Sequence, residues 1–146
     1  MASPDLTPRL NFVTLGVRDV AASRAFYERL GLKPHGMSNE HVGFFDINGT
    51  VLAVFGHDSL AHDAGTAAGE PPSFRGVSLA WNATSTAEAD AIYAHAIACG
   101  AKPVKRPEKV FWGGYSGYFS DPDGHLWEVA HNPFVSIDAK GHIVLP

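Results

Sequence analysis

The hydrophobic pattern of the first half predicts a strand followed by a half-buried helix. Residues 10–17 are rich in apolar and β-branched side chains, which favours a strand. Asp19 can then accept hydrogen bonds from the free amides at the start of a helix, and Gly31 can supply the left-handed residue that ends it. Between them, one side of the predicted helix is apolar. Its members are Val20, Phe26, Tyr27 and Leu30.

The second half repeats this order. Residues 77–81 have the composition of a strand, and Ser85 with Glu88 three positions later forms a capping box. An apolar stripe at helical spacing follows and ends before Gly100. The stripe consists of Ala89, Ile92, Tyr93 and Ala96. The two predicted helices therefore begin in register within a duplicated sequence.

A repeated turn completes each half. The sequence Asp-Ile-Asn-Gly at 46–49 reappears as Asp-Pro-Asp-Gly at 121–124, and strand-forming residues follow each turn. These elements predict two modules, each with the order β-α-β-β-β. The repeat also singles out Glu128, because its counterpart in the first half is Ala53.

The length of 146 residues is typical of one domain. We expect module one over about 8–57 and module two over about 74–133. Residues 58–73 contain glycine, proline and alanine with little periodicity and are predicted to be a mobile linker. The tail, about 134–146, alternates apolar residues around a turn, so it can form a final hairpin over the cavity or over a neighbouring chain.

Composition and charge narrow the class of partner. The net charge of -4, with basic residues gathered only at 102–109, argues against a nucleic-acid-binding surface. The longest apolar runs are too short to span a membrane, and residues 1–5 lack the pattern of a signal peptide, so we expect a cytoplasmic protein. A single cysteine, Cys99, excludes a disulfide within the chain and is predicted to be a buried apolar residue. A small molecule is the expected partner.

The motifs around the first helix and the second turn resemble the vicinal oxygen chelate superfamily, which includes glyoxalase I, extradiol dioxygenases and bleomycin resistance proteins. The residues that carry the resemblance are 17–19, 25–32 and 119–128, and with the repeat they extend it over nearly the whole chain. The resemblance implies an α+β fold in which curved mixed sheets enclose a cavity and the helices lie outside. It also makes a homodimer plausible, with swapped or unswapped pairing of modules left open.

The resemblance further implies a metal ligand on the first and the last strand of each module. The matching positions here are Phe12, Ala53, Val77 and Glu128. Only Glu128 can bind a metal, and a lone carboxylate binds a divalent ion weakly. We therefore expect no metal and no other cofactor. The alternative is a rebuilt site in which His57 and His62 join Glu128 from the linker.

If the sheets curve as the resemblance implies, aromatic side chains and one carboxylate line the cavity, as in many small-molecule sites. The predicted ligand-binding residues are Phe12, Phe55, Trp81, Phe111, Trp112, Tyr115 and Glu128. The competing interpretation is that these aromatic side chains only fill the core.

Glu128 needs an explanation, because a carboxylate among apolar side chains must find a partner or have its pKa raised. It can serve as a general base, stand opposite a cationic ligand, or pair with Arg9, Arg75 or a tyrosine hydroxyl. His125, just after the turn glycine, is predicted to be exposed.

Three functions follow. The preferred one is a metal-independent binder of a small apolar or aromatic molecule, as in the bleomycin resistance proteins. The second is a lyase, isomerase or dioxygenase of the glyoxalase type that uses a nonstandard metal site or Glu128 as the base. The third is a structural or regulatory module with a collapsed cavity.

Overall fold

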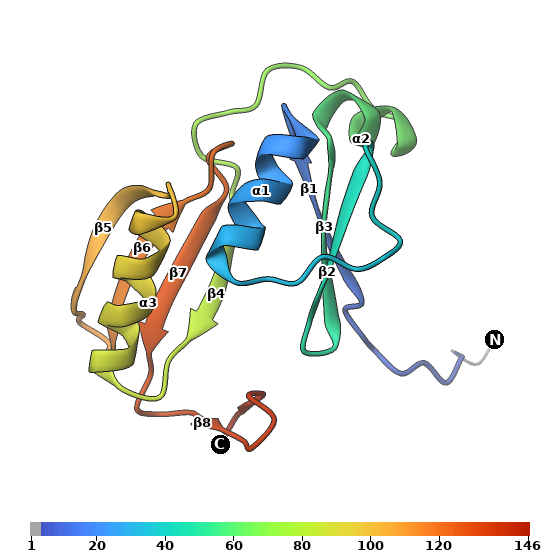
Figure 1. The fold of residues 1–146 in the computed structure, drawn as a ribbon. Helices are drawn as coiled ribbons and strands as arrows, with labels where there is room; N and C mark the ends of the chain where they lie inside the picture. The colour runs from blue at the N-terminus through green and yellow to red at the C-terminus, as the bar shows by residue number, and fades with distance from the viewer. Residues whose placement is uncertain (1–3) are drawn as a thin grey trace.

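The computed structural model describes residues 4–146 and contains two similar modules side by side (Figure 1). The first comprises β1 (Phe12–Val17), α1 (Val20–Leu30), β2 (Val42–Ile47) and β3 (Thr50–Gly56). The second comprises β4 (Ser78–Asn82), α3 (Thr86–Ala98), β5 (Lys102–Lys109), β6 (Tyr115–Ser120) and β7 (Leu126–His131). Between them lies α2 (His57–Asp63), and β8 (Ser136–Ile137) and β9 (Ile143–Val144) form the tail.

Each module has one mixed sheet. The strand order is β1-β3-β2 in the first sheet and β4-β7-β6-β5 in the second. The parallel pairs β1-β3 and β4-β7 occupy the same place, with Thr14 opposite Ala53 and Ala80 opposite Glu128. The α+β class and the curved mixed sheets predicted from the sequence are confirmed, but the sheets stay open and do not close around a cavity.

The first module lacks one of the predicted strands. The counterpart of β5 is reduced to a single bridge between Pro34 and Phe45. Proline has no backbone N–H to donate to a ladder, and Gly36 follows two residues later. The β-α-β-β-β order is therefore complete in the second module only.

The predicted helix ends are confirmed. The Asp19 side chain accepts a hydrogen bond from the Ala22 amide at 3.0 Å, and Gly31 ends α1 with a φ of 119°. Ser85 accepts from the Glu88 amide at 3.0 Å. The Glu88 carboxylate accepts hydrogen bonds from Thr84 instead of from the Ser85 amide, and these bonds lower the pKa of Glu88.

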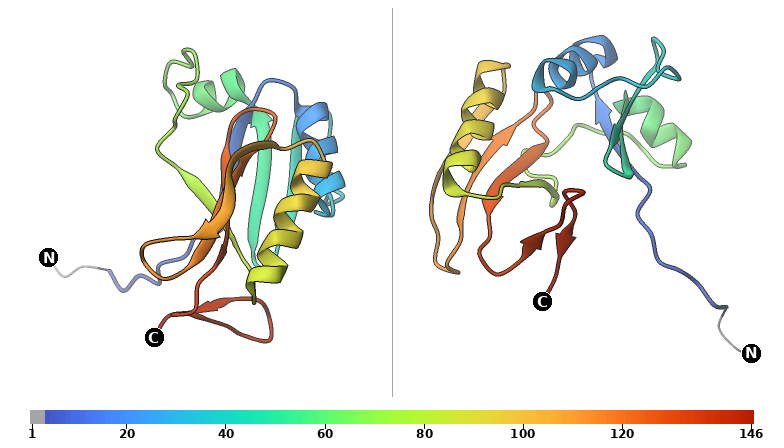
Figure 2. Two further views of the ribbon diagram at one scale, coloured as in Figure 1. Left: turned by 90° about the vertical axis from the view of Figure 1, so that its left-hand side faces the viewer. Right: turned by 60° about the horizontal axis from the view of Figure 1, so that its bottom comes forward.

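One hydrophobic core serves both modules. Helices α1 and α3 cover the same side of the two sheets, as the left view in Figure 2 shows. Phe26 and Tyr27 of α1 are buried there, and the Phe119 and Trp127 rings of the second sheet stack with centroids 6.2 Å apart. The chain thus packs its modules together through their helix-covered sides. Within the described residues no helix combines the length and apolar character needed to cross a membrane.

A buried polar network joins the modules. The fully buried Asp121 carboxylate accepts a hydrogen bond from the Tyr27 hydroxyl at 2.7 Å, and the Trp127 indole donates to the same hydroxyl at 3.1 Å. His125 Nδ1 lies 2.9 Å from Asp121. Burial alone would raise the pKa of Asp121, but hydrogen bonds from His125 and Tyr27 lower it overall.

The prediction of an exposed His125 is wrong. Its side chain is only 10% exposed, because the turn folds the imidazole back onto the Asp121 carboxylate. The pKa of Tyr27 is raised well above its ordinary value by burial and by the negative charge of Asp121. The neutral phenol therefore acts as a donor across the module boundary.

The linker is not wholly irregular. Its first part forms α2, which packs against β1 and β3 on the side opposite α1. Gly16 permits this approach, since a Cβ there would lie 3.2 Å from the His57 Cα. Residues 1–3, part of the segment inspected for a signal peptide, lie outside the described residues.

Cys99 is half-buried and joins the ends of the two long helices, so the predicted full burial is wrong. Its Sγ donates to the Arg29 carbonyl at 3.2 Å, and Arg29 Nε donates to the Cys99 carbonyl at 3.1 Å. His95 Nε2 lies 3.0 Å from the Leu30 carbonyl. The cysteine thus ties α3 to α1.

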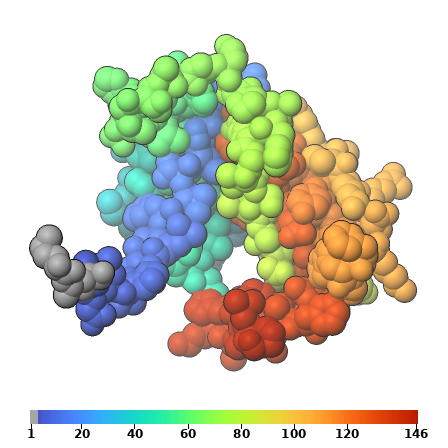
Figure 3. Space-filling view, turned by 180° about the vertical axis from the view of Figure 1, so that it is seen from behind, coloured from blue at the N-terminus to red at the C-terminus, as the bar shows by residue number. Residues whose placement is uncertain are grey.

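The tail forms the predicted hairpin and reaches the first module. β8 and β9 pair antiparallel around a turn at 138–141. Asn48, in the β2-β3 turn with a φ of 53°, donates to the Lys140 carbonyl and has its own carbonyl 3.1 Å from His142 Nε2. Figure 3 shows the tail below a hollow on the side opposite α1 and α3.

We predict that Tyr27→Phe lowers the free energy of unfolding by about 1–3 kcal/mol, because it removes a donor to Asp121 and the acceptor of the Trp127 indole. Urea unfolding followed by fluorescence measures the change. Tyr93→Phe is the matched control, since the buried Tyr93 hydroxyl has no hydrogen-bond partner among residues 4–146. Equal losses in the two variants would contradict the role of the network.

We predict that Asp121 makes the free energy of unfolding depend on pH in the acidic range. Its pKa is lower in the folded chain than the value of about 3.9 in the unfolded chain, so its contribution is full above that value and is lost as pH falls toward the folded pKa. Asp121→Asn should flatten the fall in unfolding free energy between about pH 5 and pH 2.5. Asp46→Asn, in the matching turn of the first module, should retain the slope.

Candidate functional site

The sides of the sheets that face away from α1 and α3 differ in chemistry. Directly paired residues share a face, so the strand registers define both surfaces. The apolar face, on the first sheet, carries Phe12, Thr14, Phe44, Val51, Ala53 and Phe55. The acidic face, on the second sheet, carries Ser78, Ala80, Ser116, Tyr118, Leu126 and Glu128.

Glu128 lies half-buried in the middle of β7, the second strand from the free edge of its sheet. The Tyr118 hydroxyl donates to its Oε2 at 3.1 Å, so the tyrosine partner is the one of the three expected pairings that forms. Arg75 instead donates to the Asp123 carbonyl at 2.7 Å. Within residues 4–146, Oε1 of Glu128 accepts no hydrogen bond and is available to a ligand.

The Tyr118 hydroxyl keeps its proton beside this carboxylate. Partial burial and the negative charge of Glu128 raise the pKa of Tyr118. The pair therefore offers one proton donor and one proton acceptor on adjacent strands. Such a pair can hold a polar group of a ligand or exchange a proton with it.

The apolar face contains a recess of about 270 Å³. Phe12 and Phe44 meet edge to face in it, with ring centroids 6.2 Å apart. Phe12 is 56% exposed and Met37 69% exposed, so the apolar surface is open to solvent. The recess is lined by Phe12, His35, Met37, Phe44, Asp46 and Val51.

Four of the predicted ligand-binding residues do not share a surface with Glu128. Trp81 pairs with Val129 and lies on the helix-covered side of its sheet, because Ala80 is the residue beside Glu128. Tyr115 lies on that side too, where its hydroxyl donates to Asp90 of α3 at 2.5 Å. The remaining two, Phe111 and Trp112, lie in the β5-β6 loop, where Phe111 is fully exposed and Trp112 is half-buried. The prediction that these residues share one cavity with Glu128 is wrong.

Phe12 and Phe55, also predicted to bind the ligand beside Glu128, lie on the apolar face of the other sheet. The recess that contains Phe12 does not include Glu128. The apolar face and the acidic face are thus two open half-sites in one chain.

The strand register also moves one of the expected metal positions. Phe12 lies two residues before Thr14, which pairs with Ala53, and Ser78 lies two residues before Ala80, which pairs with Glu128. Phe12 therefore corresponds to Ser78. Val77 precedes β4 and is out of phase with Glu128. The side chains at the four corrected positions are a phenyl ring, a methyl group, a hydroxyl and a carboxylate.

These residues do not fit the divalent metal that the resemblance implies, since stable sites need several N or O donors. Within residues 4–146 no three His, Cys, Asp or Glu side chains converge. His57 Nε2 is 3.2 Å from the Ala68 and Gly69 carbonyls, so that ring is held in place beside α2. His62 lies on the exposed surface of α2.

A large charged cavity was missed in the sequence. It has a volume of about 620 Å³ and lies where the ends of β1 and β3, α2, the linker and the β6-β7 turn meet. Its charged side chains come from separate segments between Arg18 and Asp123. No local motif brings them together, so only the fold could reveal the cavity.

The sequence and the fold were compared with known proteins. The model of the Glyoxalase/Bleomycin resistance protein/Dioxygenase superfamily matches residues 9–129. The chain is similar to a glyoxalase-related enzyme from Fulvimarina pelagi, with 33% identity, a TM-score of 0.85, and coverage of 95% of this chain and 99% of that one. No curated protein matches the chain.

Two further solved structures extend the likeness. A glyoxalase/bleomycin resistance protein/dioxygenase from Nocardioides is 27% identical, with a TM-score of 0.75 and coverage of 88% of this chain and 85% of that one. Lactoylglutathione lyase from Agrobacterium tumefaciens is 24% identical, with a TM-score of 0.66 and coverage of 87% and 96%, and it shows likeness of fold alone. Because the family model spans most of the sequence and both modules, the chain belongs to the Glyoxalase/Bleomycin resistance protein/Dioxygenase superfamily.

Proposed function

We propose that the chain binds a small apolar or aromatic molecule between an apolar face and an acidic face, without a metal. The observation that carries the proposal is the pairing of an open apolar recess with a carboxylate oxygen that accepts no hydrogen bond from the described residues. The recess would bury the apolar body of the ligand. Glu128 and Tyr118 would bind a polar or cationic group at its edge.

We further propose that two copies of the chain assemble so that the apolar face of one meets the acidic face of the other. Large exposed apolar side chains lie in or before the edge strands β1 and β4 and in the α1-β2 loop, and such patches often mark contact surfaces. They include Leu10, Phe12, Met37, Phe74 and Val77. In a symmetric dimer the same contact occurs twice, so it would cover these side chains on both chains and create two equivalent sites.

A second candidate function is proton transfer on the bound molecule, as in a lyase or isomerase. The Glu128–Tyr118 pair favours it, because a carboxylate and a neutral phenol 3.1 Å apart can act as base and acid. Catalysis needs only a substrate hydrogen within reach of Oε1. The two functions share one site and differ in whether the ligand leaves unchanged.

We predict that a thermal-shift screen of small aromatic molecules finds ligands whose effect depends on both faces. A ligand at about 100 times its dissociation constant stabilises a protein by about 2.7 kcal/mol. Phe12→Ala and Glu128→Gln should each weaken a hit, whereas Val104→Ala, a change at an exposed residue of β5 outside both faces and outside the proposed contact, should retain it. A hit that ignores both substitutions, or that binds only after a divalent metal is added, would contradict the proposed site.

We predict that two inactive variants restore binding when they are mixed and refolded together. Phe12→Arg blocks the apolar face and Glu128→Gln removes the carboxylate. If each site combines faces of two chains, half of the dimers are mixed and one of their two sites is intact, which gives about one quarter of the wild-type capacity. Calorimetric titration with a hit counts the sites. No recovery, with dimers present by light scattering, would assign both faces of a site to one chain.

A further inference from the structure

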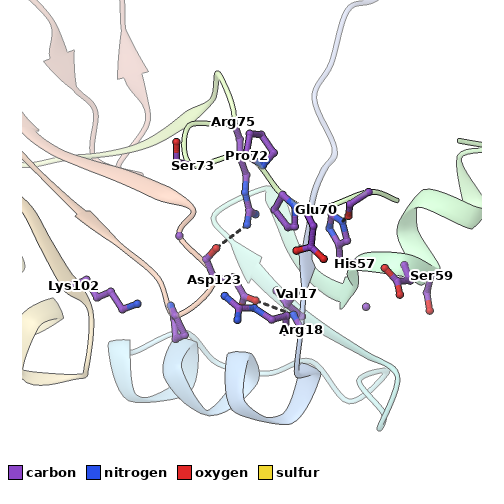
Figure 4. A pocket seen from close by; sticks show the side chains of 16 residues that line it. Val17, Arg18, His57, Ser59, Glu70, Pro72, Ser73, Arg75, Lys102 and Asp123 are labelled. Atoms are coloured by element: carbon purple, nitrogen blue, oxygen red, sulfur yellow. Dashed lines mark hydrogen bonds between the residues drawn. The ribbon is translucent and has the colours of Figure 1, made fainter. Parts of the chain in front are cut away.

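The charged cavity at the module junction is separate from the two half-sites. None of its lining residues belongs to the apolar face or the acidic face. Its volume of about 620 Å³ is in the range of small-molecule sites, and junctions between modules are a common location for them. It is partly open to solvent, and its lining comes from the linker, the β6-β7 turn and the ends of β1 and β3 (Figure 4).

Three cationic and three acidic side chains line this cavity. They are Arg18, Arg75 and Lys102, and Asp58, Glu70 and Asp123. Within residues 4–146 none of them forms an ion pair. The six charged groups around the cavity therefore do not neutralise one another in pairs.

Two of the six build the wall of the cavity. Arg75 donates to the Asp123 carbonyl at 2.7 Å and contacts His125, which holds its guanidinium against the turn. The Asp123 carboxylate accepts from the Arg18 backbone amide at 2.8 Å. These bonds fix the end of β1 and the β6-β7 turn relative to each other.

The other four charged groups are available. The Arg18 guanidinium, the Lys102 ammonium group and the carboxylates of Asp58 and Glu70 make no hydrogen bond within the described residues. Lys102 comes from β5 and Glu70 from the linker, and Figure 4 shows them on opposite sides of the cavity. Arg18 lies between them in the same view, so basic and acidic groups line one continuous cavity.

This arrangement discriminates among ligand charges. A simple anion would meet Asp58 and Glu70, and a simple cation would meet Arg18 and Lys102, so each would be repelled by half of the cavity. A molecule with both charges would satisfy both kinds of group through charge-assisted hydrogen bonds. Pro71 and Pro72 limit the freedom of the linker wall before binding.

We propose that the junction cavity binds a small zwitterion of the α-amino acid type. Its carboxylate binds Arg18 and Lys102, and its ammonium group binds Asp58 and Glu70. The side chain of the amino acid points toward the open mouth of the cavity. Because the walls come from both modules and from the linker, binding stabilises their junction.

The test uses the twenty common α-amino acids as probes, first by thermal shift and then by calorimetric titration of each hit. We expect at least one to raise the melting temperature. Its N-acetyl derivative lacks the ammonium charge and its amide lacks the carboxylate, so each should bind at least about tenfold more weakly. If no amino acid binds, or if either derivative binds as tightly as the parent, the proposal is wrong.

Variants locate the binding. The double variants Arg18→Gln with Lys102→Gln, and Asp58→Asn with Glu70→Gln, should each abolish the shift while their circular dichroism stays that of the wild type. Lys109→Gln, at the other end of β5, and Glu128→Gln should bind the amino acid normally. Loss of binding in Glu128→Gln would instead assign the amino acid to the site of the proposed function. Unchanged binding in both double variants would overturn the proposal.

Discussion

The structure depends on the buried carboxylate of Asp121. Transfer of an ionised carboxyl group from water into a protein core is unfavourable unless several donors surround it. Here the donors come from both modules: the Tyr27 hydroxyl from α1, and the His125 ring and amide from the start of β7. The carboxylate is therefore stable only when the two modules are packed together. It makes the junction specific as well as stable.

The repeated turn shows how a duplicated scaffold acquires two roles. In the first module Asp46 is exposed, and its side chain accepts a hydrogen bond from the Gly49 amide of its own turn at 3.2 Å. That turn is free to meet the tail through Asn48. The last strand of the first module has Ala53 at the position where the last strand of the second module has Glu128. One sheet therefore has an apolar face and the other has an acidic face. Two copies of one architecture thus provide complementary surfaces.

Local chemistry made much of this fold predictable. Asp19, Gly31 and Ser85 mark helix ends because each residue satisfies free backbone groups by itself. The phase of β4 depends instead on its register against β7, which lies about 50 residues away, and Trp81 was assigned to the wrong face for that reason. The helix α2 has seven residues and no side-chain cap, so its sequence signal is weak. The charged cavity has no local signal at all.

The turn at 121–124 links the core to the cavity. Asp121 points inward to Tyr27, and Asp123, two residues later, points outward, where its carboxylate accepts the Arg18 amide. Pro122 restricts the turn and Gly124 adopts a φ of 90°, so the two aspartates cannot exchange places without breaking the β6-β7 hairpin. Because Arg75 contacts both His125 and the Asp123 carbonyl, the cavity wall is anchored to the buried network. A ligand that binds this wall acts directly on the contact that holds the modules together.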